Sequence, residues 1–382
     1  MATLRRLLAA TAVMPLIACS AGEDPPEPEA TSPATAPEAP VTPPTAEAPD
    51  VRTDSAPSEV ELQLTTVASG LEAPWDIAFA DGRTFLTQRD SGAILELADD
   101  GSTEEIARLD VQAGGEGGLL GLTADPAAQG VGFYAYLTTS EDNRVVRFQP
   151  GEEPTPVLTG IPRARNHNGG RIAFGPDDLL YVATGDAGEP DLAQDPASLA
   201  GKILRLTPEG EVPDDNPTPG SPVYSLGHRN PQGLAWTADG TLYASEFGPD
   251  RDDEVNRIEP GANYGWPEVT GQAGGGGFID PVFVQQPPEA SWSGLAVLQG
   301  GGIPQWEGDL LLASLRGQRL WRLTLDDDGA VASTEALLVG ELGRLRQVVQ
   351  GPDGAVWLLT SNRDGRGNPA SDDDRVLRLG PR

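Results

Sequence analysis

The feature that most constrains the fold is a motif that recurs along most of the chain. A Gly/Asp turn precedes a short run that carries an aromatic or aliphatic pair and ends in a small or polar residue. Instances begin at residues 81, 131, 177, 239, 307 and 353, which gives about six repeats spaced roughly 45 to 70 residues apart. This spacing is typical of propeller blades, whose sheets bury their faces by packing radially around a channel. The pattern predicts an all-β propeller of about six blades.

Composition and loop lengths agree with this fold. Glycine (47 residues) and proline (36 residues) are abundant and aromatic residues make up only 5%, which suits many short strands joined by turns. No long amphipathic helical segment is present, which argues against a helical bundle. The repeats are unevenly spaced, so longer loops should interrupt some blades, and such loops are good places for a functional site.

The N-terminal segment resembles a bacterial lipoprotein signal. Residues 1–18 have a charged start at Arg5 and Arg6 and then an apolar run that is too short to span a membrane. The stretch from Leu16 to Cys19 resembles a lipobox, so we expect cleavage before Cys19 and lipidation of that cysteine. Ser20 follows, which favours outer-membrane sorting if the cell is Gram-negative. We expect a lipid anchor and a folded body on the periplasmic or extracellular side of the cell envelope.

A linker separates this signal from the folded body. Residues 19–58 are rich in Pro, Ala and Glu and show no apolar periodicity, so they cannot bury enough surface to offset their ordering entropy. We interpret them as a disordered tether. The propeller domain is then expected at residues 59–382.

The charge and cysteine count exclude several classes of function. The chain has 58 acidic and 26 basic residues and a formal net charge of -32, which disfavours nucleic-acid binding. The acidic composition is explained by a need for solubility or by adaptation to a salty habitat. It also favours a monomer. A single cysteine excludes an internal disulfide framework and a multi-cysteine metal site.

The two histidines are candidates for proton chemistry. His167 lies in a Gly-rich loop before a predicted strand that ends at Asp186. A histidine with a nearby carboxylate can act as a general base, although a structural histidine in a turn has the same local sequence. His228 lies in GHRNPQ, just before Arg229 and Asn230. An ordinary loop-to-strand junction explains that segment equally well.

Two further segments carry candidate binding residues. The stretch from Ser245 to Pro267 concentrates carboxylates and glycines, and its oxygens suit either calcium or an acidic surface turn. Its spacing does not match an EF-hand loop. Arg344 and Arg346 alternate in a predicted strand, so both guanidiniums can address one carboxylate ligand. Arg316 is a third candidate of this kind.

Taken together, the motifs resemble the soluble PQQ-dependent glucose and aldose sugar dehydrogenases, also called glucose/sorbosone dehydrogenases. The likeness runs from Leu64 to Leu379, and seven motifs occur in the family's order. They are GLEAPWDIAF, GEGGLLGL, NHNGGRIAFGPD, GHRNPQGLAW, SEFGPDRDDEVN, NYGWP and RLRQV.

The resemblance implies a six-bladed propeller with PQQ bound over the channel mouth. His167 matches the catalytic base and Asp186 its acidic partner. The residues that match the cofactor contacts are Arg229, which also belongs to the catalytic set, Asn230, Arg316 in place of a common lysine, and the carboxylate-binding pair Arg344 and Arg346. The implied reaction is oxidation of an aldose at C1 to a lactone, followed by electron transfer to an unidentified acceptor.

The resemblance also implies two calcium sites. Gly248 and Pro249 match backbone-carbonyl ligands of the calcium that polarises PQQ. Glu254 and the carbonyl of Tyr264 match a structural calcium site of the aldose dehydrogenase branch.

Three positions need separate attention. Glu116 stands in the cofactor-binding region where many members have glutamine, and its carboxylate can repel PQQ, be protonated or bind a cation. Gln347 replaces an aspartate after the arginine pair. Trp292 is placed either to stack on cofactor or sugar, or to pack in the core. The first two departures bear on cofactor affinity and sugar specificity more than on fold.

Two alternative functions remain open. A propeller that has lost turnover would act as a non-catalytic binding module, but the presence of His167, Asp186 and all the arginines argues against it. A metal-dependent lactonase would need several carboxylate or Asn ligands that converge on one metal in the channel. The arginine set would then have no role.

Overall fold

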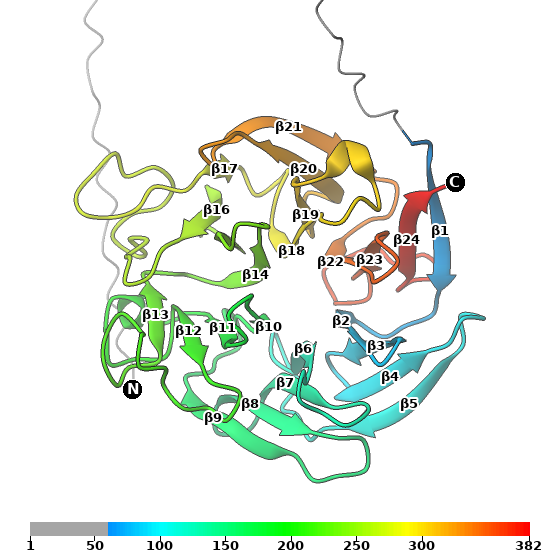
Figure 1. Cartoon of the computed structure of the whole chain (residues 1–382), viewed down its shortest axis with the longest axis horizontal. Coiled ribbons are helices and arrows are strands. Elements are labelled where there is room, and N and C mark those ends of the chain that lie inside the picture. Colours follow the sequence, from blue (N-terminus) through cyan, green and yellow to red (C-terminus); the bar gives the residue numbers. More distant parts are fainter. Residues whose placement is uncertain (1–59) are drawn as a thin grey trace, which may run out of the picture. The chain divides into compact units, whose positions relative to one another are not determined.

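The computed structural model describes residues 60–382, which form six four-stranded antiparallel sheets arranged as the blades of a ring (Figure 1). This confirms the predicted all-β six-bladed propeller. The predicted signal peptide, tether and lipidation site at Cys19 lie outside the described residues. Within residues 60–382, no helix has the length and apolar character needed to cross a membrane.

Five blades each use four consecutive strands. The first two contain β2 (Pro74–Ala80), β3 (Arg83–Gln88), β4 (Ala93–Leu97) and β5 (Thr103–Arg108), then β6 (Leu119–Ala124), β7 (Phe133–Thr138), β8 (Asn143–Phe148) and β9 (Thr155–Ile161). The third contains β10 (Ile172–Phe174), β11 (Leu180–Thr184), β12 (Lys202–Leu206) and β13 (Val223–Leu226). The fourth and fifth contain β14 (Pro231–Trp236), β15 (Leu242–Glu246), β16 (Asp253–Ile258) and β17 (Phe283–Gln285), then β18 (Trp292–Val297), β19 (Leu310–Ser314), β20 (Arg319–Leu325) and β21 (Val331–Leu337).

The sixth blade closes the ring by joining the two ends of the propeller. Its inner three strands are β22 (Leu345–Gln350), β23 (Val356–Thr360) and β24 (Val376–Pro381), and its outer strand is β1 (Leu62–Ala68). The pairing of β1 with β24 is antiparallel and begins at Leu62 opposite Pro381. The strand that leads into the first blade thus completes the last one, and hydrogen bonds close the ring.

Each repeat of the sequence motif forms the second strand of a blade, namely β3, β7, β11, β15, β19 and β23. The Gly/Asp turn of the motif connects the first and second strands. Strands β7, β11 and β19 are buried along their whole length, because a second strand has a paired strand on either side and a neighbouring blade against each face. The outer strands β5 and β21 instead carry exposed charged residues, which protects a sheet edge from pairing with other chains.

The hydrophobic core lies between neighbouring blades. Phe85 on β3 meets Phe133 on β7 edge to face, with ring centroids 4.9 Å apart. Trp292 is fully buried and stacks on Phe283 at 5.4 Å, so it belongs to the core and does not face a ligand. This settles the choice that the sequence left open for this tryptophan.

A long loop between β11 and β12 carries the short 3-10 helix η1 (Pro190–Ala193), and a second one, η2 (Pro304–Trp306), precedes β19. The chain's only lysine, Lys202, fastens the first loop. Its Nζ donates to the carbonyls of Leu192 (2.7 Å), Ala193 (3.0 Å) and Ala200 (2.7 Å). Burial of this side chain lowers the pKa of Lys202 to about 8.

Candidate active site

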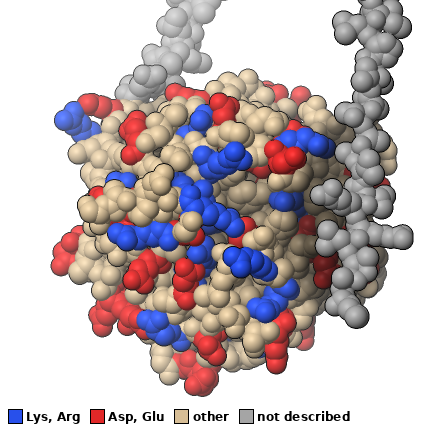
Figure 2. Space-filling view, turned by 180° about the vertical axis from the view of Figure 1, so that it is seen from behind, with Lys and Arg blue, Asp and Glu red and all other residues tan. Residues whose placement is uncertain are grey.

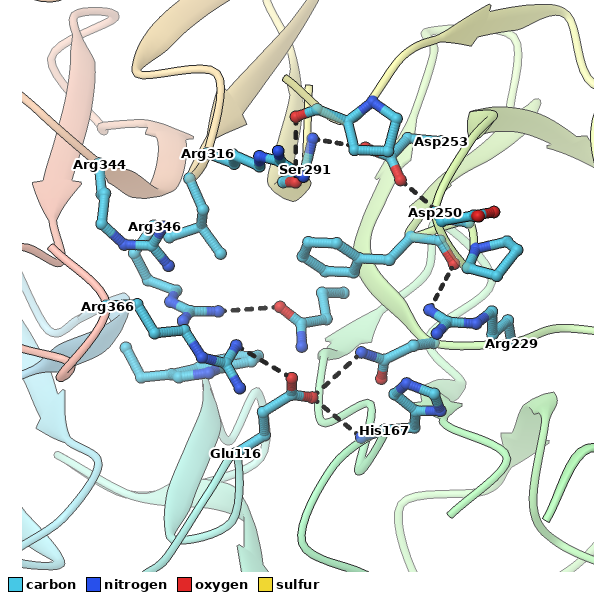
Figure 3. Close-up of a pocket in the computed structure, with 18 of the residues that line it drawn as sticks. Glu116, His167, Arg229, Asp250, Asp253, Ser291, Arg316, Arg344, Arg346 and Arg366 are labelled. Carbon is cyan, nitrogen blue, oxygen red and sulfur yellow. Dashed lines mark hydrogen bonds and ion pairs between the residues drawn. The ribbon is translucent and has the colours of Figure 1, made fainter. Parts of the chain in front are cut away.

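A cavity of about 450 Å³, called the main cavity because it holds most of the predicted site residues, opens where loops from several blades meet the ends of inner strands (Figure 3). Most of the predicted site residues line it: Glu116, His167, Arg229, Asn230, Gly248, Pro249, Arg316, Arg344 and Arg346. The other lining residues are Trp75, Arg89, Gln232, Phe247, Asp250, Asp253, Pro287, Ser291, Leu315 and Arg366. Asp186, Glu254 and Tyr264 are not among the lining residues. The cavity therefore collects six arginines in a chain of strongly negative net charge.

The loop that presents His167 has an unusual backbone. His167 adopts a positive φ of 58°, which is uncommon for a residue with a side chain. Gly185 packs so closely that a Cβ there would lie 2.0 Å from the His167 carbonyl oxygen, so only glycine fits. Backbone strain of this kind concentrates at functional sites, where the surrounding structure holds it in place.

His167 and Asp186 form a hydrogen-bonded dyad, with 2.7 Å between Nδ1 and Oδ1. Asp186 is completely buried and also accepts hydrogen bonds from the Trp266 indole N–H (2.8 Å) and the Gly188 main-chain N–H (2.7 Å). Three donors suit an ionised carboxylate, which orients Nδ1 of the imidazole as a donor. The Nε2 atom of His167 is then left to accept a proton from a ligand.

Glu116 lies beside this dyad and is ionised. Its carboxylate accepts hydrogen bonds from the His167 main-chain N–H (2.9 Å), Asn230 Nδ2 (3.3 Å) and Arg366 Nη1 (3.2 Å). Burial by itself would raise the pKa of Glu116, but the N–H of His167 and the charge of Arg366 outweigh it and hold the pKa below its usual value. Of the options that the sequence left open, the structure favours an anion paired with an arginine over a protonated group.

Arg229 and Asn230 come from the turn before β14. Arg229 Nη1 donates to the Phe247 carbonyl (3.2 Å), and its guanidinium lies over the Trp266 ring at 5.3 Å. Its Nε is buried and has no hydrogen-bond partner in the described part of the chain, and burial lowers the pKa of Arg229. The Asn230 amide oxygen accepts the N–H of Gly169, which ties this turn to the His167 loop.

The other histidine, His228, stabilises the turn that carries Arg229 and Asn230. It is fully buried, and its ring nitrogens lie 2.8 Å from Ser225 Oγ and 2.9 Å from Glu246 Oε1. Glu246 also accepts the main-chain N–H of Arg229 at 2.8 Å. His228 therefore fixes the backbone that presents Arg229 and has no access to the main cavity.

Arg344 and Arg346 both reach the cavity from the start of β22, as their alternation predicted. Arg344 Nη2 donates to Asp364 (2.8 Å), and Arg346 Nη1 donates to Gln232 Oε1 (2.8 Å). Burial lowers the pKa of Arg346 to about 9, and its Nε lacks a hydrogen-bond partner among residues 60–382. Such buried, incompletely bonded guanidiniums suit an anionic ligand.

The replacement of aspartate by Gln347 does not touch the main cavity. Its Nε2 donates to Asp76 Oδ1 at 2.5 Å, and Asp76 also pairs with Arg171 at 2.6 Å. All three side chains are buried among the inner strands. Gln347 is therefore part of a buried polar cluster outside the main cavity.

Gly248 and Pro249 line the main cavity together with two carboxylates, Asp250 and Asp253. Asp253 Oδ1 accepts the N–H of Gly248 (2.8 Å), and its Oδ2 accepts the N–H of Ser291 (2.6 Å). Burial raises the pKa of Asp253 to about 6. These four neighbouring residues, which can offer carbonyl and carboxylate oxygens, thus line the same cavity.

Glu254 and Tyr264 line a separate, small cavity of about 10 Å³ together with Glu246. Glu254 accepts hydrogen bonds from the N–H of Gly271 (2.7 Å) and from Asn256 Nδ2 (3.1 Å). Burial and the nearby charge of Glu246 raise the pKa of Glu254 to about 8. Across residues 60–382, no three His, Cys, Asp or Glu side chains converge in a metal-binding cluster.

Several site residues escaped the sequence analysis. Arg89, Arg366 and Asp364 lie in loops without a recognisable motif. Only the folded ring brings Arg89 and Arg366 to the cavity and Asp364 to its ion pair with Arg344. Trp266 belongs to the NYGWP motif, so the sequence could have marked it as a candidate site residue. Nothing in the sequence, however, predicts that its indole N–H bonds to Asp186.

Fold and cavity together define the class: a six-bladed propeller in which a histidine–carboxylate dyad faces an arginine-lined site. The chain belongs to the Glucose / Sorbosone dehydrogenase family, whose sequence profile matches residues 71–369. It is thus a member of a family of quinoprotein sugar dehydrogenases, which are oxidoreductases.

Individual relatives agree with this membership. The solved PQQ-bound aldose sugar dehydrogenase from Streptomyces coelicolor is 47% identical, has a TM-score of 0.78, and aligns over 85% of this chain and 99% of its own. An aldose sugar dehydrogenase from Escherichia coli is 30% identical over 353 residues, 81% of this chain and 92% of the relative. Quinoprotein glucose dehydrogenase B from Acinetobacter calcoaceticus is 28% identical over 81% of this chain and 87% of the relative.

Proposed function

We propose that the protein oxidises aldose sugars at C1 to lactones, using PQQ and calcium, with His167 as the general base. The observation that carries the proposal is the arrangement of the main cavity. A dyad with a free Nε2 atom and a set of guanidiniums face the same space. The relative from Streptomyces coelicolor, which was solved in a PQQ-bound form, supports the choice of cofactor.

The residues of the main cavity fit PQQ. PQQ is a tricarboxylate, and the cavity offers several guanidiniums in a volume of about 450 Å³, within the usual range for ligand pockets. The Nε atoms of Arg229 and Arg346 are buried donors without hydrogen-bond partners in residues 60–382, and a bound carboxylate or quinone oxygen would satisfy them. The residues that would hold the cofactor are Arg229, Asn230, Arg316, Arg344 and Arg346.

Calcium fits the oxygen-bearing residues of the same cavity. The carbonyls of Gly248 and Pro249 are the proposed ligands of a calcium ion next to the cofactor, with Asp250 and Asp253 adding negative charge nearby. Glu254 and the Tyr264 carbonyl are the proposed ligands of a second, structural calcium ion in the small cavity. Both proposed calcium sites rest on the chemistry of these oxygens and on the family resemblance.

The protein's own residues account for the acid–base part of the reaction. When bound, PQQ supplies the acceptor for the hydride that leaves sugar C1, and calcium makes that acceptor more electrophilic. His167 Nε2 takes the proton of the C1 hydroxyl, so that the C1–O bond becomes the carbonyl of the lactone. Asp186 holds Nδ1 and stabilises the imidazolium that results.

A dye-linked oxidation assay on residues 59–382 tests this proposal. We expect dye reduction with an aldose only when PQQ and calcium are both present. His167→Ala should lower turnover by about 10³-fold, because the base is lost, while PQQ binding is retained. Undiminished turnover by the variant would refute the base assignment, and failure of the wild type to bind PQQ would refute the function.

The same preparation separates the two alternative functions. A non-catalytic binding module would bind PQQ without reducing dye for any aldose. A lactonase would hydrolyse a lactone with calcium and without PQQ. The six arginines that line the main cavity would have no role in a lactonase, which favours the dehydrogenase.

We further propose that the protein is a monomeric lipoprotein of the cell envelope, anchored through Cys19. The support is the sequence of residues 1–18 and the lipobox from Leu16 to Cys19. Metabolic labelling with a fatty acid should mark the wild type and not Cys19→Ala. Labelling of the variant would contradict the anchor.

A further inference from the structure

Glu116 places a negative charge inside a cavity proposed to hold an anion. Its side chain is 18% exposed and ionised, and it lies next to His167 and Asn230. A carboxylate close to a tricarboxylate cofactor repels it, and the low-dielectric surroundings make such repulsion stronger than in water. Unless another group compensates for this charge, Glu116 weakens cofactor binding.

Arg366 is positioned to supply that compensation. Its Nη1 lies 3.2 Å from Glu116 Oε1, and within residues 60–382 this is the only ion pair that Glu116 makes (Figure 3). Arg366 lies 250 residues further along the chain, on the loop between β23 and β24, and it lines the main cavity itself. Closure of the ring brings this loop to the Glu116 loop.

The other paired arginines of the cavity have different partners. Arg89 pairs with Asp90 at 2.6 Å, and Arg344 and Arg346 pair with Asp364 at 2.8 Å and 4.0 Å. None of the three forms an ion pair with Glu116. Loss of Arg366 would therefore leave the Glu116 charge to be offset by the guanidiniums that face the ligand, and the cavity would attract an anion less strongly.

We propose that Arg366 sets the affinity of the main cavity for its anionic cofactor by neutralising Glu116. The inference rests on the proposed function, because it takes PQQ as the ligand. Arg366 acts through Glu116, so the affinity for PQQ depends on the summed charge of these two side chains. A pair of neutral side chains should serve as well as the ion pair.

A set of four proteins tests the inference through PQQ binding, measured by calorimetric titration in the presence of calcium and without sugar or dye. The set is the wild type, Arg366→Gln, Glu116→Gln and the double variant. Arg382→Gln is the matched control, since Arg382 forms an exposed 2.7 Å pair with Glu61 and does not line the main cavity.

At low ionic strength we expect Arg366→Gln to bind PQQ about tenfold more weakly, which corresponds to about 1.4 kcal/mol. Glu116→Gln should bind at least as tightly as the wild type, and the double variant should return to within about threefold of it. Raising the salt concentration should shrink the defect of Arg366→Gln, because Arg366 is 52% exposed and its field is screened. The Arg382→Gln control should match the wild type.

Two results would overturn the inference. Wild-type affinity in Arg366→Gln would show that the charge of Glu116 needs no partner. A double variant as weak as Arg366→Gln would show that the guanidinium binds the cofactor directly or only shapes its loop. If Arg366→Gln fails to fold, Arg366→Lys carries the test, since it keeps the charge and must then retain most of the affinity. A wild type that binds no PQQ would overturn the proposed function and this inference together.

Discussion

At the scale of single residues, Trp266 connects the two halves of the candidate active site. Its indole N–H donates to Asp186 Oδ2 at 2.8 Å, and its ring carries the guanidinium of Arg229 at 5.3 Å. Trp266 thus contributes both to the orientation of the His167–Asp186 dyad and to the position of Arg229, which is proposed to bind the cofactor. Partners that orient a catalytic carboxylate commonly matter almost as much as the reacting groups themselves.

Trp266→Phe isolates the hydrogen bond from the ring. Phenylalanine keeps an aromatic face for Arg229 but cannot donate to Asp186, so the dyad loses one of its fixed contacts. We expect kcat to fall about tenfold, equivalent to about 1.4 kcal/mol, with little change in KM. Steady-state kinetics with a saturating cofactor concentration would measure this, and an unchanged kcat would show that the indole N–H plays no part in orienting Asp186.

Asp364 is the counter-charge for the arginine pair. Its carboxylate lies 2.8 Å from Arg344 and 4.0 Å from Arg346, and its side chain is 2% exposed. Burial alone would raise the pKa of Asp364, but the two guanidiniums outweigh it and hold the pKa below its usual value. A depressed pKa in the folded state means that the carboxylate stabilises the fold above the unfolded pKa and loses that effect in acid.

Asp364→Asn should therefore lower the free energy of unfolding by about 3 kcal/mol near neutral pH, since it leaves two buried guanidiniums without their carboxylate. The difference from the wild type should persist down to about pH 4 and then shrink as the pH falls through the depressed pKa. Denaturant unfolding at a series of pH values measures both. A difference that stays constant down to pH 2 would contradict the ion-pair explanation.

At the scale of strands and loops, the sequence predicted what is periodic and local. The repeated motif marked the second strand of every blade, because a strand buried on both faces leaves a recognisable apolar run. Arg344 and Arg346, which alternate at the start of β22, both line the main cavity, as the pattern suggested. Contacts between distant loops were not predictable in this way. The pairing of Glu116 with Arg366 depends on ring closure, and no local pattern records it.

The closing strand β1 offers a test at the same scale. Leu64 faces the core of the sixth blade, whereas its neighbour Gln63 points to solvent. Leu64→Asp should lower the free energy of unfolding by about 2 kcal/mol, because a charge replaces an apolar side chain packed against the last blade. Gln63→Asp adds the same charge on the exposed face and should stay within about 0.5 kcal/mol of the wild type. If both variants lost the same free energy of unfolding, the hydrogen-bonded pairing of β1, and not the packing of Leu64, would be what closes the ring.

At the scale of the whole molecule, the charges are unevenly distributed. The chain has a formal net charge of -32, yet basic side chains gather across the middle of the face shown in Figure 2, with acidic ones mostly towards its edge. Net negative charge favours solubility, while local clusters of arginine attract anionic ligands.

Calcium removal should act on the whole fold. The proposed second ion would link Glu254 on β16 to the loop that carries Tyr264, and an ion that binds only the native state stabilises it. We expect a chelator to lower the melting temperature of the wild type by about 5 °C. Glu254→Gln should melt lower to begin with and respond less to the chelator. A wild-type melting temperature that ignores the chelator would argue against both calcium sites.

The buried Lys202 side chain has a consequence for a protein that is proposed to act on aldoses. Open-chain sugars glycate proteins by condensing with accessible, uncharged amines of lysine. The chain contains one lysine, and that side chain is fully buried with its Nζ bonded to three carbonyls. Every other basic side chain that could reach solvent is a guanidinium or an imidazole. The folded propeller therefore has no accessible lysine amine that its proposed substrates could glycate, and crosslinks that begin at glycated lysine should not form on it.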